Sequence, residues 1–328
     1  MKTGPIIAWI TSLTLASVAT DWIMTEELYA VNHTTSKHSL DDFGSTHLRS
    51  GSKVMYSLPP VLLIGVQKGG TSAISDWLFE GGYRRSRVFD NDPFFADKEP
   101  HFFDHEEEYE KGIEFYASRY QTNPGEYAGP ALDATPETFL NPGRVFETYS
   151  KAGANQINEL KMIVILRDPV ARELSLYNHM VHDFVAIPVK GEWYMDVGRE
   201  DGSVMSFGEY VDKLYRKNDE SYYAEHLSKW FNLFNRQQIL VLSYEELKQD
   251  NNKARKRVQE FLGHDIPGEN LKEANDNGSQ LKVVAPSPEA REKLLETLRP
   301  QYQELYELLD KFSGPPMEQK PFPRFPEY

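Results

Sequence analysis

Short apolar runs alternate with helical patterns along the chain from about residue 58 onward. Three nearly continuous apolar runs predict buried parallel strands: VLLIGV from Val61, MIVILR from Met162 and QILVLS from Gln238. Apolar side chains at helical spacing precede the third run, in SYYAEHLSKWFNLF at residues 221–234. This alternation predicts an α/β domain with a mostly parallel central sheet flanked by helices.

The two flanks of this region have other patterns. Residues 25–57 are polar and lack sustained periodicity, which is typical of a flexible stem. A helical pattern that begins at Ser287 contains Pro300, so we expect a helical unit interrupted near that proline. Residues 313–328 are rich in proline and are expected to form a tail that buries no core. The folded domain is therefore expected to span residues 58–312.

Residues 1–24 resemble a targeting segment. Lys2 precedes an apolar run, Ile6 to Ala19, which ends in small residues before Asp21. The run is shorter than the roughly 20 apolar residues of a typical membrane span. A cleaved signal peptide is therefore favoured over a signal anchor, and a buried helix is the third alternative. Both favoured alternatives direct the chain to the secretory pathway, with membrane contact only if the segment remains as an anchor.

Composition narrows the classes of function. The chain of 328 residues has a formal net charge of -14 and a pI near 5.2, which argues against a nucleic-acid binder. It contains 0 cysteines, so disulfides, thiolate metal sites and a cysteine nucleophile are excluded. Glycosylation sequons at Asn32 and Asn277 fit a secreted glycoprotein, although such short patterns are common by chance.

A glycine-rich turn follows the first predicted strand, in VLLIGVQKGGTSAISDWL. Such a turn exposes backbone N–H groups, and the N-terminus of the next helix adds its positive dipole, so the turn is suited to a phosphate group. The alternative is a glycine-rich connection with a solvated lysine. The candidate phosphate ligands are Lys68, Gly69, Gly70, Thr71 and Ser72.

The order of residues in this loop distinguishes it from the loop of nucleotide hydrolases. The nucleotide-hydrolase pattern is G-x-x-x-x-G-K-[ST], whereas this chain has G-x-x-K-G-G-T-S and no convincing strand that ends in a metal-holding aspartate. The loop resembles the 5′-phosphosulfate loop of the sulfotransferases that use 3′-phosphoadenosine 5′-phosphosulfate (PAPS). This resemblance implies a P-loop-like sulfotransferase fold, and it implies that Lys68 neutralises charge on the oxygen that leaves with the product, 3′-phosphoadenosine 5′-phosphate (PAP).

A second segment, MIVILRDPVARELSLYNHM, fits the same family. These sulfotransferases hold the 3′-phosphate of the donor with an arginine at a strand end and a serine eight residues later. Arg167 and Ser175 have these positions. Arginine offers a planar fork to two phosphate oxygens, although an arginine and a serine at such positions are often ordinary surface residues.

The acceptor side is expected in DKEPHFFDHEEEYEKGIEFYASRY, residues 97–120. This segment resembles the heparan sulfate 3-O-sulfotransferases and the N-sulfotransferase domain of the related bifunctional enzymes. The resemblance implies that Glu99 is the catalytic base and that His101 and Asp104 line the acceptor site, with His101 also close to the chemistry. Alternatively, Glu99 belongs to a solvated acidic surface and His101 packs on its phenylalanine neighbours.

Some features depart from these relatives. Ala134, in DATP, replaces a lysine that helps bind the acceptor, and the cysteine pair often found near the C-terminus is missing. Only Lys282 is a candidate for the lysine-glycine-arginine loop that closes over the donor. Arg84 and Arg85, in YRRSR, are candidate acceptor ligands, and KARKR at 253–257 is a weaker one.

Together these features predict a PAPS-dependent carbohydrate sulfotransferase that requires no metal. Its expected location is the lumen of the secretory pathway, with the Golgi favoured. The hydroxyl or amine of a heparan-sulfate-like glycan or another polysaccharide is the expected acceptor, and a tyrosyl-protein acceptor stays open. A nucleotide kinase and a catalytically inactive PAP- or glycan-binding protein are the alternatives. Oligomeric state is not predicted.

Overall fold

Four parallel strands form the centre of the computed structural model, which describes residues 56–90, 92, 96–123, 125, 129–186, 193–213, 219–268, 271, 286–311 and 322–326. The described strands are ordered β2-β1-β3-β4. Their bounds are β1 (Val61–Gly65), β2 (Leu132–Asp133), β3 (Lys161–Leu166) and β4 (Ile239–Ser243). The α/β fold and its three longer strands were predicted correctly, whereas β2 was not, because two residues carry no readable periodicity.

The pairing register aligns the N-terminal residues of neighbouring strands. Val61 of β1 pairs with Leu132 of β2 and with Lys161 of β3, and Met162 of β3 pairs with Ile239 of β4. Parallel strands need crossover connections, which are supplied here by helices.

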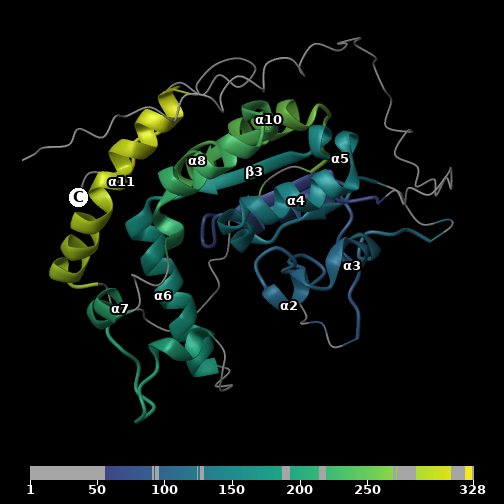
Figure 1. The fold of residues 1–328 in the computed structure, drawn as a ribbon. Coiled ribbons are helices and arrows are strands. Elements are labelled where there is room, and N and C mark those ends of the chain that lie inside the picture. The colour runs from purple at the N-terminus through teal and green to yellow at the C-terminus, as the bar shows by residue number, and fades with distance from the viewer. Residues whose placement is uncertain are drawn as a thin grey trace, which may run out of the picture. The chain divides into compact units, whose positions relative to one another are not determined.

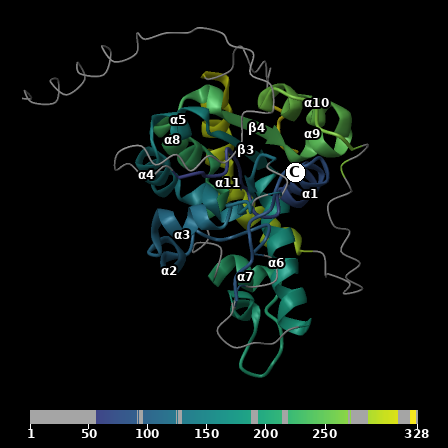
Figure 2. The same cartoon turned by 90° about the vertical axis from the view of Figure 1, so that its right-hand side faces the viewer.

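Helices cover both faces of the sheet (Figure 2). Alternate residues of β1 enter two different cores: Leu62 and Ile64 lie in one, Val61 and Leu63 in the other. The Val61 face is covered by α1 (Thr71–Glu80), α9 (Tyr244–Gln249) and α10 (Asn251–Leu262). The Leu62 face is covered by α4 (Pro142–Ala152) and α8 (Tyr223–Leu233), with α5 (Ala154–Glu159) beside α4.

A third apolar cluster lies beyond the sheet, around α6 (Figure 1). It joins α6 (Pro169–Ala186), η3 (Trp193–Val197), α7 (Phe207–Lys213) and the first half of α11 (Pro288–Lys311). The remaining short elements are α2 (Glu106–Tyr109), α3 (Gly112–Ser118), η2 (Pro136–Leu140), η5 (Asp219–Ser221) and η6 (Arg236–Gln238).

The predicted interruption at Pro300 is wrong, because α11 runs without a break from Pro288 to Lys311. Proline removes one helical hydrogen bond, but apolar side chains anchor the helix on both sides of it. Leu294 and Leu298 are buried in the cluster around α6, and Leu305 is buried in the core of the Leu62 face. Packing at both ends therefore outweighs the local cost of the proline.

The prediction that the C-terminal tail buries no core is also wrong. Phe322 and Phe325 are only 4% and 5% exposed and belong to the core of the Leu62 face. The backbone N–H of Phe325 donates to the Tyr306 hydroxyl of α11 at 2.7 Å. Through these two aromatic side chains, residues 322–326 pack against α11 and the core of the Leu62 face.

The predicted targeting segment, residues 1–24, and almost all of the predicted stem lie outside the described residues, as do both sequons. Among the helices that the structure describes, none has the length and apolar character needed to cross a membrane.

Candidate functional site

The residues that follow the four strands gather at the carboxyl edge of the sheet, where ligands bind in open α/β folds. The predicted phosphate-binding loop, residues 66–70 and called the phosphate loop below, follows β1, and Arg167 follows β3. Tyr244 follows β4, and Thr135 lies just beyond β2. The sheet therefore brings together segments that are more than 100 residues apart in the sequence.

The phosphate loop has a tightly turned backbone that leaves no room for a side chain at Gly69. Lys68 has φ 63° and Gly70 has φ 96°, both in the left-handed region. A Cβ on Gly69 would lie 2.5 Å from the carbonyl oxygen of Ile165. The loop leads directly into α1 at Thr71, so its N–H groups and the helix dipole act at one place.

Arg167 connects β3 to this loop. Its Nη1 donates to the backbone carbonyl of Lys68 at 3.0 Å, and its guanidinium carbon lies 4.5 Å from the centre of the Tyr244 ring. Its buried Nε has no hydrogen-bond partner within the described part of the chain. A close-fitting glycine cradle and a half-buried guanidinium whose Nε has no partner among the described residues suit a phosphate-bearing ligand.

Lys68 lies in a confined, positively charged environment. Burial, together with the charge of Arg167, lowers the pKa of Lys68, and the charge of Lys98 acts in the same direction. The carboxylates of Asp183 and Glu99 oppose this shift. An anion bound at the loop would relieve the mutual repulsion of these cations.

The structure describes three of the four other residues that were predicted to bind the PAPS donor. Thr71 and Ser72 form the first turn of α1, and Ser175 is a half-buried residue of α6, two turns beyond Arg167. Lys282 lies outside the described residues. Their roles in donor binding stay predictions.

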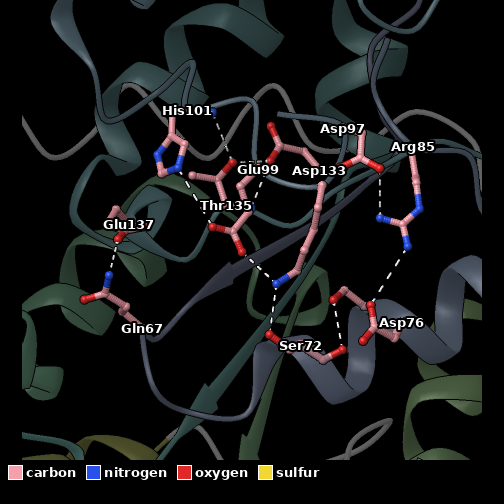
Figure 3. A network of polar contacts seen from close by, with 12 residues as sticks. Gln67, Ser72, Asp76, Arg85, Asp97, Glu99, His101, Asp133, Thr135 and Glu137 are labelled. Atoms are coloured by element: carbon pink, nitrogen blue, oxygen red, sulfur yellow. Dashed lines mark hydrogen bonds and ion pairs between the residues drawn. The ribbon is translucent and has the colours of Figure 1, made fainter. Parts of the chain in front are cut away.

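On the acceptor side, the Glu99 carboxylate lies beside the phosphate loop (Figure 3). The ammonium of Lys98 donates to Glu99 Oε1 at 2.6 Å and to Ser72 Oγ at 3.0 Å. The other oxygen of Glu99, Oε2, lies 3.8 Å from Nε2 of His101. The predicted base is therefore linked to both the loop and the neighbouring histidine.

Hydrogen bonds from Ala134 and Thr135, which connect β2 to η2, fix the segment that carries Glu99. The N–H of Ala134 donates to the carbonyl of Lys98 at 3.1 Å, and the N–H of His101 donates to Oγ1 of Thr135 at 3.4 Å. The Thr135 hydroxyl donates to Asp133 at 2.7 Å, which in turn accepts from Tyr116 at 2.8 Å.

His101 and Asp104 form a tight pair. Nδ1 of His101 lies 2.6 Å from Oδ2 of Asp104, and the His101 ring stacks on His105 with 4.7 Å between the ring centres. Burial opposes protonation, but the hydrogen bond and charge of Asp104, with the charges of Glu137 and Glu99, raise the pKa of His101 to about 9. A cationic imidazole therefore lies beside the Glu99 carboxylate at neutral pH.

Glu137 borders the same region from η2. The amide of Gln67 donates to its Oε1 at 2.6 Å, while its buried Oε2 has no partner among the described residues (Figure 3). Burial raises the pKa of Glu137 to about 8, helped by the charges of Glu220, Asp104 and Glu99 and opposed by His101.

One group of residues could offer ligand atoms to a metal within the described part of the chain. These atoms, on His101, Asp104 and His105, lie within 4.8 Å of one another. A histidine binds a metal through a neutral ring, whereas His101 is largely protonated at neutral pH. The expectation that the reaction needs no metal stays a prediction.

Arg84 and Arg85 are engaged in contacts within the protein. Arg84 donates to the carbonyls of Gly129 and Tyr120, at 2.6 Å and 3.1 Å. Arg85 donates to Asp97 at 3.1 Å and lies 3.9 Å from Asp76. In the weaker candidate, KARKR, Lys253 and Arg257 both pair with Glu246. Acceptor binding by these arginines stays a prediction.

Sequence reasoning missed several residues of this site. Lys98 lies directly before the predicted base, but no sequence pattern indicates that its ammonium reaches Ser72. Burial lowers the pKa of His179 in α6, and the positive charge of Lys68 adds to this effect. Nε2 of His179 lies 3.7 Å from Oδ2 of Asp183, one turn later. The i, i+4 spacing of these two residues is the sequence signal that could have indicated their pairing.

Similarity to known proteins agrees with this arrangement. The chain is 33% identical over 218 residues to heparan sulfate glucosamine 3-O-sulfotransferase 3B1 from Homo sapiens, covering 65% of this chain and 47% of that protein. It is 26% identical over 228 residues to bifunctional heparan sulfate N-deacetylase/N-sulfotransferase 4 from Mus musculus, covering 68% and 24%. The chain spans about half the length of the 3-O-sulfotransferases that it matches.

The fold also has a known counterpart. The crystal structure of a sulfotransferase from Alicyclobacillus acidocaldarius superposes with a TM-score of 0.50 and 19% identity, over 77% of this chain and 96% of that one. The model of the sulfotransferase domain matches residues 58–283, which include the phosphate loop, the Glu99 segment and Arg167. The chain therefore belongs to the sulfotransferase family.

Proposed function

We propose that this protein transfers a sulfuryl group from PAPS to a hydroxyl or amine of a carbohydrate, with a heparan-sulfate-like glycan as the first acceptor to consider. The single observation that carries the proposal is the position of Glu99, whose carboxylate is linked through Lys98 to Ser72 at the phosphate loop. A candidate base thus lies next to a candidate site for the phosphosulfate. Membership of the sulfotransferase family supports the same donor.

The reaction is an in-line displacement at sulfur. The acceptor oxygen or nitrogen forms a bond to sulfur while the bond between sulfur and the bridging phosphate oxygen breaks. Glu99 takes the proton of the acceptor, and the bond electrons leave with the phosphate of PAP. Lys68 stabilises the charge that develops on that oxygen, and the phosphate loop and Arg167 hold the donor in place.

The acceptor side is proposed from chemistry and from the relatives. The two relatives described above carry heparan sulfate in their names. The cationic His101, held by Asp104, can donate a hydrogen bond to an oxygen of the acceptor beside Glu99. The proposal places the protein in the secretory pathway, as the targeting pattern of residues 1–24 predicts, and in the Golgi lumen within that pathway.

Two measurements on the purified full chain test the function. Calorimetry with PAP and without metal measures the donor site, and ATP with Mg²⁺ is the comparison. Transfer of ³⁵S from labelled PAPS is then measured on desulfated heparan sulfate, on N-deacetylated heparan sulfate, on a neutral polysaccharide and on a tyrosine-containing peptide.

The proposal predicts PAP binding that is lost in Lys68→Ala, and label transfer to at least one of the polysaccharides. Binding of ATP with Mg²⁺ and not of PAP would instead favour a phosphotransferase. Binding of PAP without transfer to any acceptor would favour a binding protein without catalysis. Transfer to the peptide alone would overturn the carbohydrate acceptor.

A further inference from the structure

The ammonium of Lys98 lies between the phosphate loop and the predicted base. It donates to Ser72 Oγ at 3.0 Å and to Glu99 Oε1 at 2.6 Å, and its side chain is only 16% exposed. We propose that Lys98 is a positioning residue that sets the Glu99 carboxylate and the Ser72 hydroxyl relative to each other. This inference rests on the proposed function, because it assigns a task to Lys98 within that reaction.

The backbone of Lys98 is fixed independently of its side chain. Its carbonyl accepts from the N–H of Ala134 at 3.1 Å, next to β2, and the carbonyl of Asp97 accepts from the N–H of Ser86 at 2.8 Å. Ala134 is completely buried. A lysine stem that starts from a fixed backbone loses less freedom when its ammonium is held than one on an open surface.

The direction of the hydrogen bonds gives each partner of Lys98 a defined role. An ammonium only donates, so the Ser72 oxygen accepts and its own proton is directed elsewhere, available to an anion at the phosphate loop. Glu99 accepts through Oε1, which leaves Oε2 as the oxygen that can receive the acceptor proton. Lys98 therefore orients one group toward the donor and one toward the acceptor.

Lys98 also contributes charge to the donor site. Its ammonium is close enough to Lys68 to lower the pKa of that residue. Glu99, which pairs with Lys98 at 2.6 Å, balances part of this charge and acts on the pKa of Lys68 in the opposite direction. A neutral residue at position 98 would leave Glu99 without its nearest positive partner.

Because the chain contains 0 cysteines, Lys98→Cys introduces a single thiol that can be modified selectively. Alkylation with 2-bromoethylamine restores an ammonium at nearly the length of lysine, whereas iodoacetamide adds a neutral amide. Lys151→Cys is the matched control, because Lys151 pairs with Glu147 at the surface of α4, far outside this network. Mass spectrometry verifies each modification, and thermal unfolding verifies that each variant is folded.

The readouts are kcat at saturating donor and acceptor, the KM of each, and the Kd of PAP. Misplacement of the base is expected to lower kcat on the order of 10- to 100-fold in Lys98→Cys, with a change of only a few fold in the Kd of PAP. Aminoethylation is expected to restore most of kcat, and the amide is expected to restore little. A merely structural role would give the same kcat with either modification, provided that the protein is folded.

A double-mutant cycle with Ser72→Ala tests the link to the loop. If Lys98 acts through Ser72, the loss of kcat in Lys98→Met with Ser72→Ala is smaller than the product of the single losses. Wild-type kcat in Lys98→Cys, or equal kcat after both alkylations, overturns the role of Lys98 while leaving the proposed function intact. Absence of turnover in the wild type overturns the proposed function and this inference with it.

Discussion

Arg167 Nη1 donates to the backbone carbonyl of Lys68 across 3.0 Å, so the end of β3 holds the phosphate loop that follows β1. The same guanidinium lies against the Tyr244 ring, and its Nε has no hydrogen-bond partner among the residues that the structure describes. One arginine thereby holds the loop, and its proposed role as a ligand of the donor can be tested by substitution.

Arg167→Met is expected to weaken PAP binding by about 10- to 100-fold, because hydrogen bonds to charged groups each contribute about 1.5–3 kcal/mol. Arg167→Lys keeps the charge but loses the fork, so an intermediate affinity is expected. Calorimetry measures both variants. Arg299→Met, which removes an exposed arginine of α11, is the control, and an unchanged Kd for Arg167→Met would contradict the assigned role.

Gly69→Ala is expected to destabilise the protein by about 1–3 kcal/mol and to abolish measurable PAP binding. The added Cβ would lie 2.5 Å from the carbonyl oxygen of Ile165 and 2.8 Å from that of Val66, so the loop must shift. Gly143→Ala is the matched control, since its Cβ meets nothing within 4 Å. Urea unfolding measures the stability of both variants, and calorimetry measures their PAP binding. Equal stability and equal PAP binding of the two variants would show that the loop tolerates the added side chain.

Glu137→Gln is expected to change how the free energy of unfolding depends on pH. Burial raises the pKa of Glu137 to about 8 from its ordinary 4.5, so the folded state holds this proton more tightly than the unfolded state. Its stabilising contribution is complete below pH 4.5 and is lost as pH rises through 8.

The glutamine variant has no such proton to lose. Its stability relative to wild type is therefore expected to rise between pH 5 and pH 9, by on the order of 2–3 kcal/mol. Chemical unfolding at several pH values measures the difference. A difference that is constant across this range would show that Glu137 titrates normally.

Phe325→Ala is expected to cost about 3–5 kcal/mol of stability, as is typical of a buried phenylalanine. Phe325 is 5% exposed and contacts the rings of Tyr302, Tyr306 and Phe322. Phe89→Ala removes a ring that is 38% exposed and serves as the control, with a markedly smaller expected loss. Thermal and urea unfolding compare the two, and equal losses would contradict a docked tail.

The parts of the fold that were predicted correctly are those with a pattern in one continuous stretch of sequence. The apolar runs of β1, β3 and β4 and the glycine-rich loop each carry a local signal, so both strands and loop could be located. Pro300 was misread because its local effect is outweighed by the burial of Leu298 and Leu305, which lie in different cores. The docking of Phe325 depends likewise on a distant partner.

The candidate site likewise contains residues with a local sequence signal and residues whose role depends on distant partners. Lys68, Glu99 and Arg167 follow recognisable motifs, whereas the role of Lys98 depends on its distance to Ser72, which only the folded chain defines. The shifted pKa of Glu137 arises from burial and from three carboxylates in two other segments, and no pattern near residue 137 indicates it. The role of Lys98, the pKa of Glu137 and the docking of Phe325 all depend on tertiary proximity, which no local pattern indicates.

The most direct test of the account is kcat of Glu99→Gln in sulfuryl transfer from PAPS, at saturating donor and acceptor. Glutamine keeps an oxygen that can accept from Lys98 but cannot take the acceptor proton. We expect kcat to fall by at least about 100-fold while the Kd of PAP changes less than about twofold. A variant that binds PAP and retains wild-type kcat would contradict the assignment of Glu99 as the base.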